Sequence, residues 1–310
     1  MRWTTYVSPS DGQEHPAVLS GGSLHGLRTA TRLVDLLGDD GELLARSAEQ
    51  ALTDPLDVVA ETDAELLAPI PVPPSVRDFY AYEGHVKTFK AASGQSMHSD
   101  WYELPVFYFQ NPAAIHGPRA EVQVPPGCAK FDYELEFAAV IGRGGANLSP
   151  EEAEQHIAGY MLLCDWSARD LQARESRQGM GPAKGKDSAT SLGPWFVTAD
   201  ELESLRGGNA FDLEMRASVN GQPYSKGNAG DLYWTFGQMI SYASRGTRVV
   251  AGDIIGSGTV GTGCILELST VHGEEQYPWL KPADEVRLEA DHLGAITARI
   301  SEPWPVHPLK

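Results

Sequence analysis

The sequence of Phe131–Gly142 reads FDYELEFAAVIG, and its aromatic and β-branched residues followed by a glycine predict a single β-strand. Side chains two residues apart on a strand share a face, so Glu134 and Glu136 are expected to lie side by side. Two carboxylates at that spacing repel each other unless a cation or a shared proton lies between them. The apolar residues that follow, up to Ile141, favour an inner strand over an exposed polar edge. A hard divalent metal ion would satisfy such a buried pair.

The composition is that of a globular protein: the 310 residues are 42% hydrophobic and 21% charged. The formal net charge of −18 argues against nucleic acid and anionic membrane as partners, because both require a basic surface. It does not argue against a small anionic substrate. Cys128, Cys164 and Cys264 are far apart and indicate neither a disulfide framework nor a zinc motif, which favours a reducing cytoplasm. No stretch has the roughly 18 apolar residues of a membrane span, and residues 1–24 lack the apolar segment of an export signal.

A proline-rich connector divides the chain near residue 70. It contains Pro69, Pro71, Pro73 and Pro74, which favour stiff, extended backbone. We therefore expect a small N-terminal domain over residues 1–74 and a main domain over residues 75–310. Most patterned segments of the main domain predict strands, including a hairpin around Asn220-Gly221, so the expected fold class is mostly β with added helices, α+β.

Two acidic residues are expected where strands end. Asp78 lies where an aromatic strand turns into a helix, and His85 follows about two helical turns later. Asp165 follows the apolar strand over residues 160–164 and precedes a short helix. Rigid elements often place functional groups at their ends, although Asp78 can equally be a helix cap. Asp165 can equally form a local ion pair with Arg169.

Two further candidates lie in the second half of the chain. Lys186 follows Gly185, which would let the backbone approach a ligand closely, although a glycine-rich loop also commonly carries a surface lysine. Glu267 lies among apolar residues in Cys264–Leu268, which we predict to be a strand. It is either tethered to a buried partner or directed outward. The glycine-rich loop before it is followed by this strand and lacks the lysine of a phosphate-binding loop, so nucleotide binding is not expected.

Taken together, these residues resemble the fumarylacetoacetate hydrolase family, and its fumarylacetoacetase branch more than its smaller acylpyruvase-like members. The resemblance covers roughly residues 75–305 and rests on five motifs in the order of the family. The motifs are Asp78-Phe79-Tyr80 with His85, Tyr133–Glu136, Asp165–Gln172, Gly185-Lys186, and Gly258-Thr259 with Leu266–Leu268.

The resemblance implies a role for each of these residues. The implied metal ligands are Asp78, Glu134, Glu136 and Asp165. Oxygen ligands suit Mg²⁺, Ca²⁺ or Mn²⁺ better than zinc. The implied water-activating pair is His85 and Glu267, the implied oxyanion-stabilising groups are Arg169, Gln172 and Lys186, and the implied substrate contacts are Tyr80, Tyr108 and Thr259.

The resemblance also implies the fold and the reaction. The main domain is expected to be a mixed β-sandwich roll, assembled as a homodimer. The implied reaction is hydrolysis of a carbon–carbon bond in a fumarylacetoacetate- or acylpyruvate-like 1,3-diketo acid, in the catabolism of an aromatic or cyclic compound. The alternatives are a metal-dependent hydratase, decarboxylase or isomerase of a 2-oxo acid, and a non-catalytic ligand-binding protein on the same scaffold.

One departure from the family bears on the substrate. The fumarylacetoacetase branch carries an arginine shortly after the histidine, where it grips the distal carboxylate of the substrate. This chain has only Lys87 and Lys90 in that region, and a lysine does not offer the two-pronged contact of a guanidinium. Arg174 and Arg177 are alternative cations for the same task.

Overall fold

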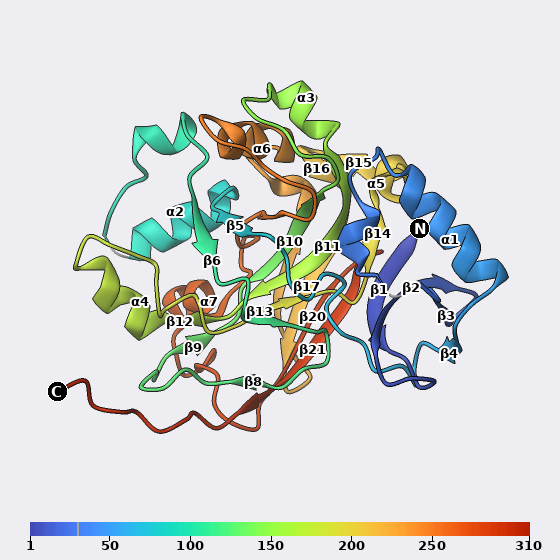
Figure 1. Ribbon diagram of the computed structural model, residues 1–310. Coiled ribbons are helices and arrows are strands. Elements are labelled where there is room, and N and C mark those ends of the chain that lie inside the picture. Colours follow the sequence, from blue (N-terminus) through green and yellow to red (C-terminus); the bar gives the residue numbers. More distant parts are fainter. Residues whose placement is uncertain (30, 93) are drawn as a thin grey trace.

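The computed structural model describes residues 1–29, 31–92 and 94–310 and consists of β-sheets with helices packed around them (Figure 1). The predicted fold class, strands with added helices, is confirmed. Within the described residues, no helix combines the length and the apolar character needed to cross a lipid bilayer.

The larger sheet has 12 strands. They are β1 (Arg2–Val7), β2 (Glu14–Ser20), β3 (Ser23–Gly26), β4 (Val58–Ala60), β5 (Val76–Phe79), β6 (Phe107–Gln110), β7 (Ile115–His116), β10 (Leu135–Ile141), β11 (Ile157–Asp165), β13 (Thr190–Leu192), β14 (Phe196–Thr198) and β19 (Ile254–Gly256). The main path runs β4-β3-β2-β1-β14-β11-β10-β19-β5-β6, and β13 joins it at β11 and carries β7. Strands β10 and β11 therefore occupy the middle of the sheet.

A second sheet has five strands in the order β18-β17-β20-β21-β8. They are β8 (Val122–Gln123), β17 (Glu214–Val219), β18 (Gln222–Asn228), β20 (Glu285–Ala290) and β21 (Gly294–Ser301). Two short pairs complete the strands: β9 (Phe131–Asp132) with β12 (Ser167–Ala168), and β15 (Arg206–Gly207) with β16 (Ala210–Phe211). The predicted hairpin is confirmed as β17–β18, and Asn220 and Gly221 form its turn with positive φ angles of 51° and 75°.

The helices are short and lie outside the sheets. The α-helices are α1 (Glu42–Thr53), α2 (Glu83–Ala92), α3 (Pro150–Glu154), α4 (Arg169–Ser176), α5 (Ala199–Leu202), α6 (Phe236–Ser244) and α7 (Ile265–His272). The 3-10 helices are η1 (Leu33–Leu36), η2 (Ser99–Tyr102), η3 (Glu203–Leu205) and η4 (Ala229–Asp231). In Figure 1, α2 and α4 lie on one side of the sheet strands and α1 on the other.

The core explains why β10 reads as a continuous apolar run. Its residues alternate between two hydrophobic clusters: Phe137 and Ala139 belong to one, and Ala138 and Val140 to the other. A strand that is buried on both faces needs apolar side chains on both. Burying each large side chain contributes roughly 1.5–3 kcal/mol, so this strand is a rigid support for whatever stands at its end.

The first 74 residues extend the larger sheet. Strand β1 pairs with β14 through Trp3 and Phe196, and β2, β3 and β4 follow outward in order. In Figure 1 these strands and α1 are blue and lie together beside the main part of the sheet. The division into domains at residue 74 stays a prediction.

The stretch Phe131–Gly142 is not the single strand expected from its sequence. Phe131 and Asp132 pair with β12, and β10 begins only at Leu135. Between them, Glu134 forms an isolated bridge with Cys264. The chain changes partners here, so the two predicted glutamates belong to different hydrogen-bonding environments.

The strand predicted at Cys264–Leu268 is wrong, because Ile265–His272 form helix α7. The side chain of Asp132 accepts hydrogen bonds from the backbone N–H groups of Ile265, at 2.7 Å, and Leu266, at 3.1 Å. These N–H groups would otherwise lack partners at the start of a helix. The cap comes from 133 residues away, so the local apolar pattern gave no sign of it.

Candidate active site

Neighbouring strands of the larger sheet bring the predicted acidic residues to one edge. Asp78 lies near the end of β5, Glu136 near the start of β10, and Asp165 at the end of β11. Strand β10 is antiparallel to β11 and β19, and β19 is parallel to β5. The start of β10 therefore meets the ends of β5 and β11, with Glu134 just before it.

Three of the four predicted metal ligands converge. Asp78, Glu134 and Asp165 are buried, and each offers a carboxylate oxygen within 4.8 Å of the others. Glu136 lies outside this group of three but beside Asp78. The N–H of Gly258 donates to both, at 3.2 Å to Asp78 Oδ1 and at 3.1 Å to Glu136 Oε2. We call these four residues the carboxylate cluster.

Gly258 can serve two carboxylates only because it has no side chain. Its φ angle is +79°, and a Cβ there would stand 2.6 Å from the carbonyl oxygen of Phe79. The position therefore requires glycine, and the backbone N–H takes the place that a side-chain donor would otherwise fill.

Two cations lie against the cluster. The Lys186 ammonium contacts Glu134 and lies 2.5 Å from Asp165 Oδ2. The Arg169 guanidinium lies 2.8 Å from Glu134 Oε1 and 2.7 Å from Asp132 Oδ2. Burial alone would raise the pKa of Glu134, but the charges of Lys186 and Arg169 outweigh it and hold that pKa below its usual range.

The other carboxylates of the cluster shift the opposite way. Burial, followed by the charges of Asp78 and Glu134, raises the pKa of Glu136 well above its usual range. Burial also raises the pKa of Asp165 well above its usual range, even though Lys186 opposes the shift. These carboxylates lack enough positive charge nearby to stay ionised at little cost.

The residues present fit a divalent cation. Asp165 Oδ1 is buried and, within the described part of the chain, has no hydrogen-bond partner. Buried oxygens normally have a partner, so this unpaired carboxylate oxygen fits the role of a metal ligand. All the donors in the cluster are carboxylate oxygens, which suit Mg²⁺, Mn²⁺ or Ca²⁺.

Tyr108 and Gln110 on β6 hold the cluster from the side. The Tyr108 hydroxyl is within hydrogen-bonding distance of both Asp78 Oδ2, at 2.7 Å, and Asp165, and its single proton can be donated to either. The Gln110 amide donates to Asp78 Oδ2 at 3.3 Å. Tyr108, predicted as a substrate contact, is thus within hydrogen-bonding distance of two predicted metal ligands. Gln110 was missed, because no motif in the sequence marks it.

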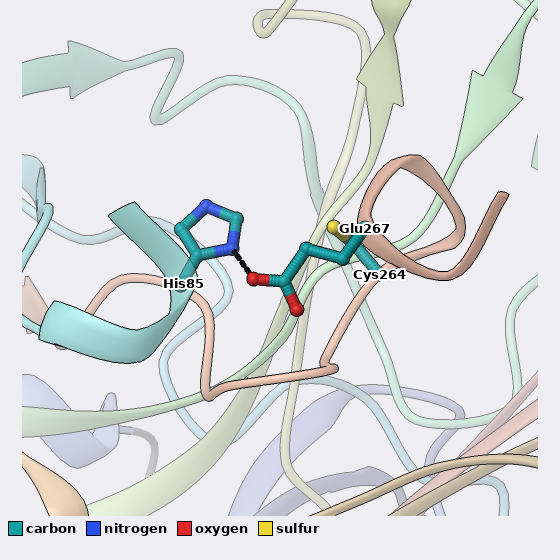
Figure 2. Close-up of side chains that lie close together, drawn as sticks. All are labelled: His85, Cys264 and Glu267. Atoms are coloured by element: carbon teal, nitrogen blue, oxygen red, sulfur yellow. Dashed lines mark hydrogen bonds and ion pairs between the residues drawn. The ribbon is translucent and has the colours of Figure 1, made fainter. Parts of the chain in front are cut away.

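The predicted water-activating pair is assembled from two helices. His85 on α2 and Glu267 on α7 are buried, and His85 Nδ1 lies 2.6 Å from Glu267 Oε1 (Figure 2). The residues are 182 positions apart in the sequence. Because Nδ1 donates to the carboxylate, Nε2 is left as the acceptor nitrogen of the neutral ring.

A cavity of about 360 Å³ opens onto these groups. Ten of the predicted site residues line it: Asp78, Tyr80, His85, Tyr108, Glu134, Glu136, Arg169, Gln172, Lys186 and Thr259. Asp165 and Glu267 are not among the lining residues and lie behind it. Lys90, one of the two lysines noted after His85 in the sequence, also lines it. Nothing in the sequence indicated Phe89, Val106 and Phe107, which complete an apolar part of the wall. Arg174 and Arg177, considered above as cations for a distal carboxylate, do not line it.

The remaining predicted residues contact the cluster, one of its cations or the His85 ring. The Thr259 hydroxyl donates to Glu136 Oε1 at 3.3 Å. The Gln172 side-chain oxygen accepts from Arg169 Nη1, also at 3.3 Å. Tyr80 packs edge-on against the His85 ring, with 5.5 Å between the ring centroids.

The loop that carries Lys186 is held by a residue that sequence reasoning missed. The carboxylate of Glu175 accepts hydrogen bonds from the N–H groups of Ala183 at 3.0 Å, Lys184 at 2.7 Å and Gly185 at 3.1 Å. Gly185 also lies directly against α4, because a Cβ there would stand 2.6 Å from Gln172 Cβ. Helix α4 thus fixes the backbone from which Lys186 reaches the cluster. Nothing local in the sequence signals this role.

Comparisons with known proteins show the family of this chain. A family model described as fumarylacetoacetate (FAA) hydrolase C-terminal matches residues 75–301. Fumarylacetoacetase of Oryza sativa subsp. japonica is 28% identical in an alignment of length 290, and the match covers 75% of this chain and 67% of that protein. Mitochondrial oxaloacetate tautomerase FAHD2A of Homo sapiens is 28% identical over 263 residues, which is 84% of this chain and 77% of that protein.

A solved structure shares the fold. Maleylpyruvate hydrolase from Sphingobium sp. SYK-6, in complex with manganese (II) ion and pyruvate, superposes with a TM-score of 0.72 at 23% identity. The superposition covers 98% of this chain and 100% of that one.

Proposed function

The chain belongs to the fumarylacetoacetate hydrolase family, and we propose that it is a metal-dependent enzyme that hydrolyses a carbon–carbon bond in a 1,3-diketo acid. The family contains hydrolases, isomerases and tautomerases that act on 2-oxo acids. The observation that carries the choice of hydrolysis is the buried contact of 2.6 Å between His85 and Glu267 beside the carboxylate cluster. A hydrolase must activate water, whereas a decarboxylase needs no such pair.

The carboxylate cluster would hold the metal. Asp78, Glu134, Glu136 and Asp165 supply the oxygen ligands, for which Mg²⁺, Mn²⁺ and Ca²⁺ are candidates. When bound, such an ion supplies positive charge that polarises a substrate carbonyl.

His85 is the proposed general base. With Nδ1 donating to Glu267, Nε2 can take a proton from a water molecule in the cavity, and the resulting hydroxide attacks the carbonyl carbon. Glu267 orients the ring and stabilises the imidazolium that forms. His85 then holds the proton that the departing carbon needs when the carbon–carbon bond breaks.

Lys186 and Gln172 are the proposed donors to the oxyanion of the tetrahedral intermediate. Both line the cavity. Burial disfavours the charged form of Lys186, but the charges of Asp165 and Glu134 outweigh it and raise the pKa of the ammonium above its usual range. Lys186 therefore stays charged. It stabilises the oxyanion by its charge and by a hydrogen bond, and it does not give up its proton. Arg169 is already paired with Asp132 and Glu134, so its contribution is to hold Glu134 in place.

The cavity limits the substrate to a small acid. Its volume is about 360 Å³, and Phe89, Val106 and Phe107 give it an apolar side. Lys90 is the cation on that side, so it is the candidate partner for a distal carboxylate. An acylpyruvate with a short acyl group fits these features. The proposed place of its hydrolysis is the catabolism of an aromatic or cyclic compound.

A substrate panel tests the proposal. Purified protein is assayed against acylpyruvates, fumarylacetoacetate and 2-oxo acids with Mg²⁺, Mn²⁺ or Ca²⁺, and the products are identified by mass spectrometry in water enriched in ¹⁸O. Hydrolysis predicts cleavage into two acids with one heavy oxygen in the released acyl acid. Cleavage that is unchanged in His85→Ala would remove the assigned base.

Isomerisation, tautomerisation, hydration or decarboxylation of a 2-oxo acid is the alternative. The oxaloacetate tautomerase relative, whose match covers 84% of this chain, supports this alternative. In that case the panel would show a rearranged, hydrated or decarboxylated product and no cleavage between the two carbonyls. No turnover of any compound with any of the metals would favour a ligand-binding protein. The expected homodimer and the cytoplasmic location stay predictions.

A further inference from the structure

A second group of metal-binding side chains lies next to the carboxylate cluster. His85, Cys264 and Glu267 each offer one ligand atom, and these atoms lie within 4.8 Å of one another. The three residues are exposed by only 4%, 0% and 4%, respectively. Figure 2 shows the His85 ring on α2 facing the Glu267 carboxylate, with the Cys264 sulfur at the start of the helix that carries Glu267.

The donor atoms differ from those of the carboxylate cluster. Here they are an imidazole nitrogen, a thiol sulfur and a carboxylate oxygen. Zn²⁺ binds all three kinds of atom, and three protein ligands with one open position are common in its sites. A hard ion such as Mg²⁺ prefers oxygen ligands and binds the thiol sulfur poorly. The cysteines showed no zinc motif by spacing, because the fold and not the sequence brings Cys264 beside His85.

The charges of such a site would balance. A divalent ion with one thiolate, one carboxylate and a neutral imidazole sums to zero, which suits a site closed off from water. The contact of 2.6 Å between His85 Nδ1 and Glu267 Oε1 would have to widen, since two ligands at about 2.0 Å from a tetrahedral zinc stand roughly 3.3 Å apart. A shift of less than about 1 Å in two side chains achieves this. The cavity reaches His85 and supplies the route for the ion.

We propose that His85, Cys264 and Glu267 form a zinc site and that its occupation switches off the water-activating base. On binding, the Cys264 thiol releases its proton to solvent. The imidazole proton moves from Nδ1, which becomes the ligand, to Nε2. Glu267 exchanges the hydrogen bond from His85 for the metal.

The inhibition follows from the position of that proton, and this part rests on the proposed function. In the active form Nε2 carries a lone pair and can accept a proton from water in the cavity. In the zinc form Nε2 carries the proton, so it cannot accept another from water. Zinc therefore lowers kcat while Mg²⁺ stays in the carboxylate cluster, and additional Mg²⁺ does not restore activity.

Cobalt titration tests the site without relying on activity. The full chain is saturated with Mg²⁺ and titrated with Co²⁺, whose bond to a thiolate gives an intense near-ultraviolet band that carboxylate ligands do not give. The proposal predicts one such band per chain, displaced by an equivalent of Zn²⁺. It predicts no band in Cys264→Ser and at least a roughly tenfold weaker zinc affinity, by the scale of losing ligand support.

The chain supplies matched controls in its other two cysteines. Cys164 is buried and Cys128 is partly exposed. The double variant Cys128→Ser/Cys164→Ser keeps Cys264 as the sole thiol and leaves the proposed site intact, so it must retain the band. A band that is lost in this double variant, that persists in Cys264→Ser, or that is absent from the wild type overturns the proposal.

Activity supplies the second readout. Turnover of the diketo acid by the wild type should fall with zinc at the concentration that displaces cobalt, and Cys264→Ser should keep its turnover at that concentration. Equal inhibition of both proteins would contradict the switch even if the band is present. A cobalt band in a protein that cleaves no substrate would sustain the zinc site and refute the proposed function instead.

Discussion

The carboxylate cluster and the group of His85, Cys264 and Glu267 are neighbours, yet the chain builds them in different ways. The cluster stands at the ends of strands in the middle of the larger sheet, and its donors are all oxygens. The second group joins two helices, and its donors are nitrogen, sulfur and oxygen. Strand ends hold like charges together, whereas helices α2 and α7 hold complementary groups in contact.

This difference separates the two tasks of the proposed reaction. The cluster is short of positive charge, as the raised pKa values of Glu136 and Asp165 indicate, so it is suited to hold a cation. His85 and Glu267 already form a hydrogen bond with each other and need no added cation, so the pair is suited to move a proton. Variants in one region at a time show whether metal affinity and catalytic rate change independently.

The largest expected effect comes from removing the base. His85→Ala should lower kcat by about 10²–10⁴-fold, which is the usual contribution of a general base. Its affinity for Mn²⁺, measured by calorimetry, should match that of the wild type, since the cluster is untouched. His98→Ala is the control, because that side chain is 76% exposed. A parallel loss of Mn²⁺ binding in His85→Ala would show that the two regions are one site.

Glu136→Gln changes the carboxylate cluster and leaves the base intact. It should weaken Mn²⁺ binding by at least about tenfold to a hundredfold, because it removes a charged ligand. The melting temperature of the metal-free protein should stay the same or rise, since burial and neighbouring carboxylates raise the pKa of Glu136 and disfavour its charge. Glu267→Gln, another buried glutamate, is the control that keeps Mn²⁺ affinity. Equal losses in both variants would contradict the assignment of Glu136.

The pH dependence of metal binding should follow the raised carboxylates. The ordinary pKa values are 3.8 for Asp165 and 4.5 for Glu136, and both are raised in the folded protein. The metal-free fold is therefore favoured by protonation of these groups, and that stabilisation is lost as the pH rises from below 4 through the raised values. A cation must displace the same protons, so Mn²⁺ affinity should rise with pH, by up to about tenfold per unit for each proton released.

Calorimetric titrations at pH 5, 6, 7 and 8 check this rise. The wild type should gain affinity across the series, and Glu136→Gln should gain less because one titrating group is gone. An affinity that is constant from pH 5 upward would mean that the cluster has no such protons to lose.

The smallest expected effect concerns the loop that joins the cluster to α4. Glu175→Gln removes the carboxylate that accepts from three successive N–H groups, so Lys186 should lose its fixed position. We expect kcat to fall by less than about tenfold, with a smaller change in KM, since small misplacements near the reacting groups cost rate. Glu151→Gln on α3, an exposed glutamate, is the control. Full activity in Glu175→Gln would show that the loop carrying Lys186 keeps its position without the Glu175 carboxylate.

The two regions also differ in how much of them the sequence revealed. Asp78 and Asp165 were located because each was expected where a strand ends, and the structure places Asp78 near the end of β5 and Asp165 at the end of β11. A short helix was expected after Asp165, and α4 begins at Arg169. Local periodicity sufficed for these residues, because their elements are set by the buried faces of the sheet.

Long-range contacts explain what the sequence concealed. Helix α7 looks like a strand locally, and it is Asp132, 133 residues earlier, that caps its start. Neither Glu175 nor Cys264 stands out in any motif, because Glu175 bonds to the backbone of residues 183–185 and Cys264 lies beside His85, which is distant in the sequence. The position of Glu136 beside Asp78, and not within the group of three, depends on Gly258 and likewise required the fold.

The decisive measurement for a metal site in the carboxylate cluster is the anomalous scattering of manganese in crystals of the protein soaked in Mn²⁺. We expect one strong peak among Asp78, Glu134 and Asp165, roughly 2.0–2.4 Å from their oxygens and with Glu136 adjoining it. A map with no peak between these carboxylates, or with the manganese bound only elsewhere, would contradict it.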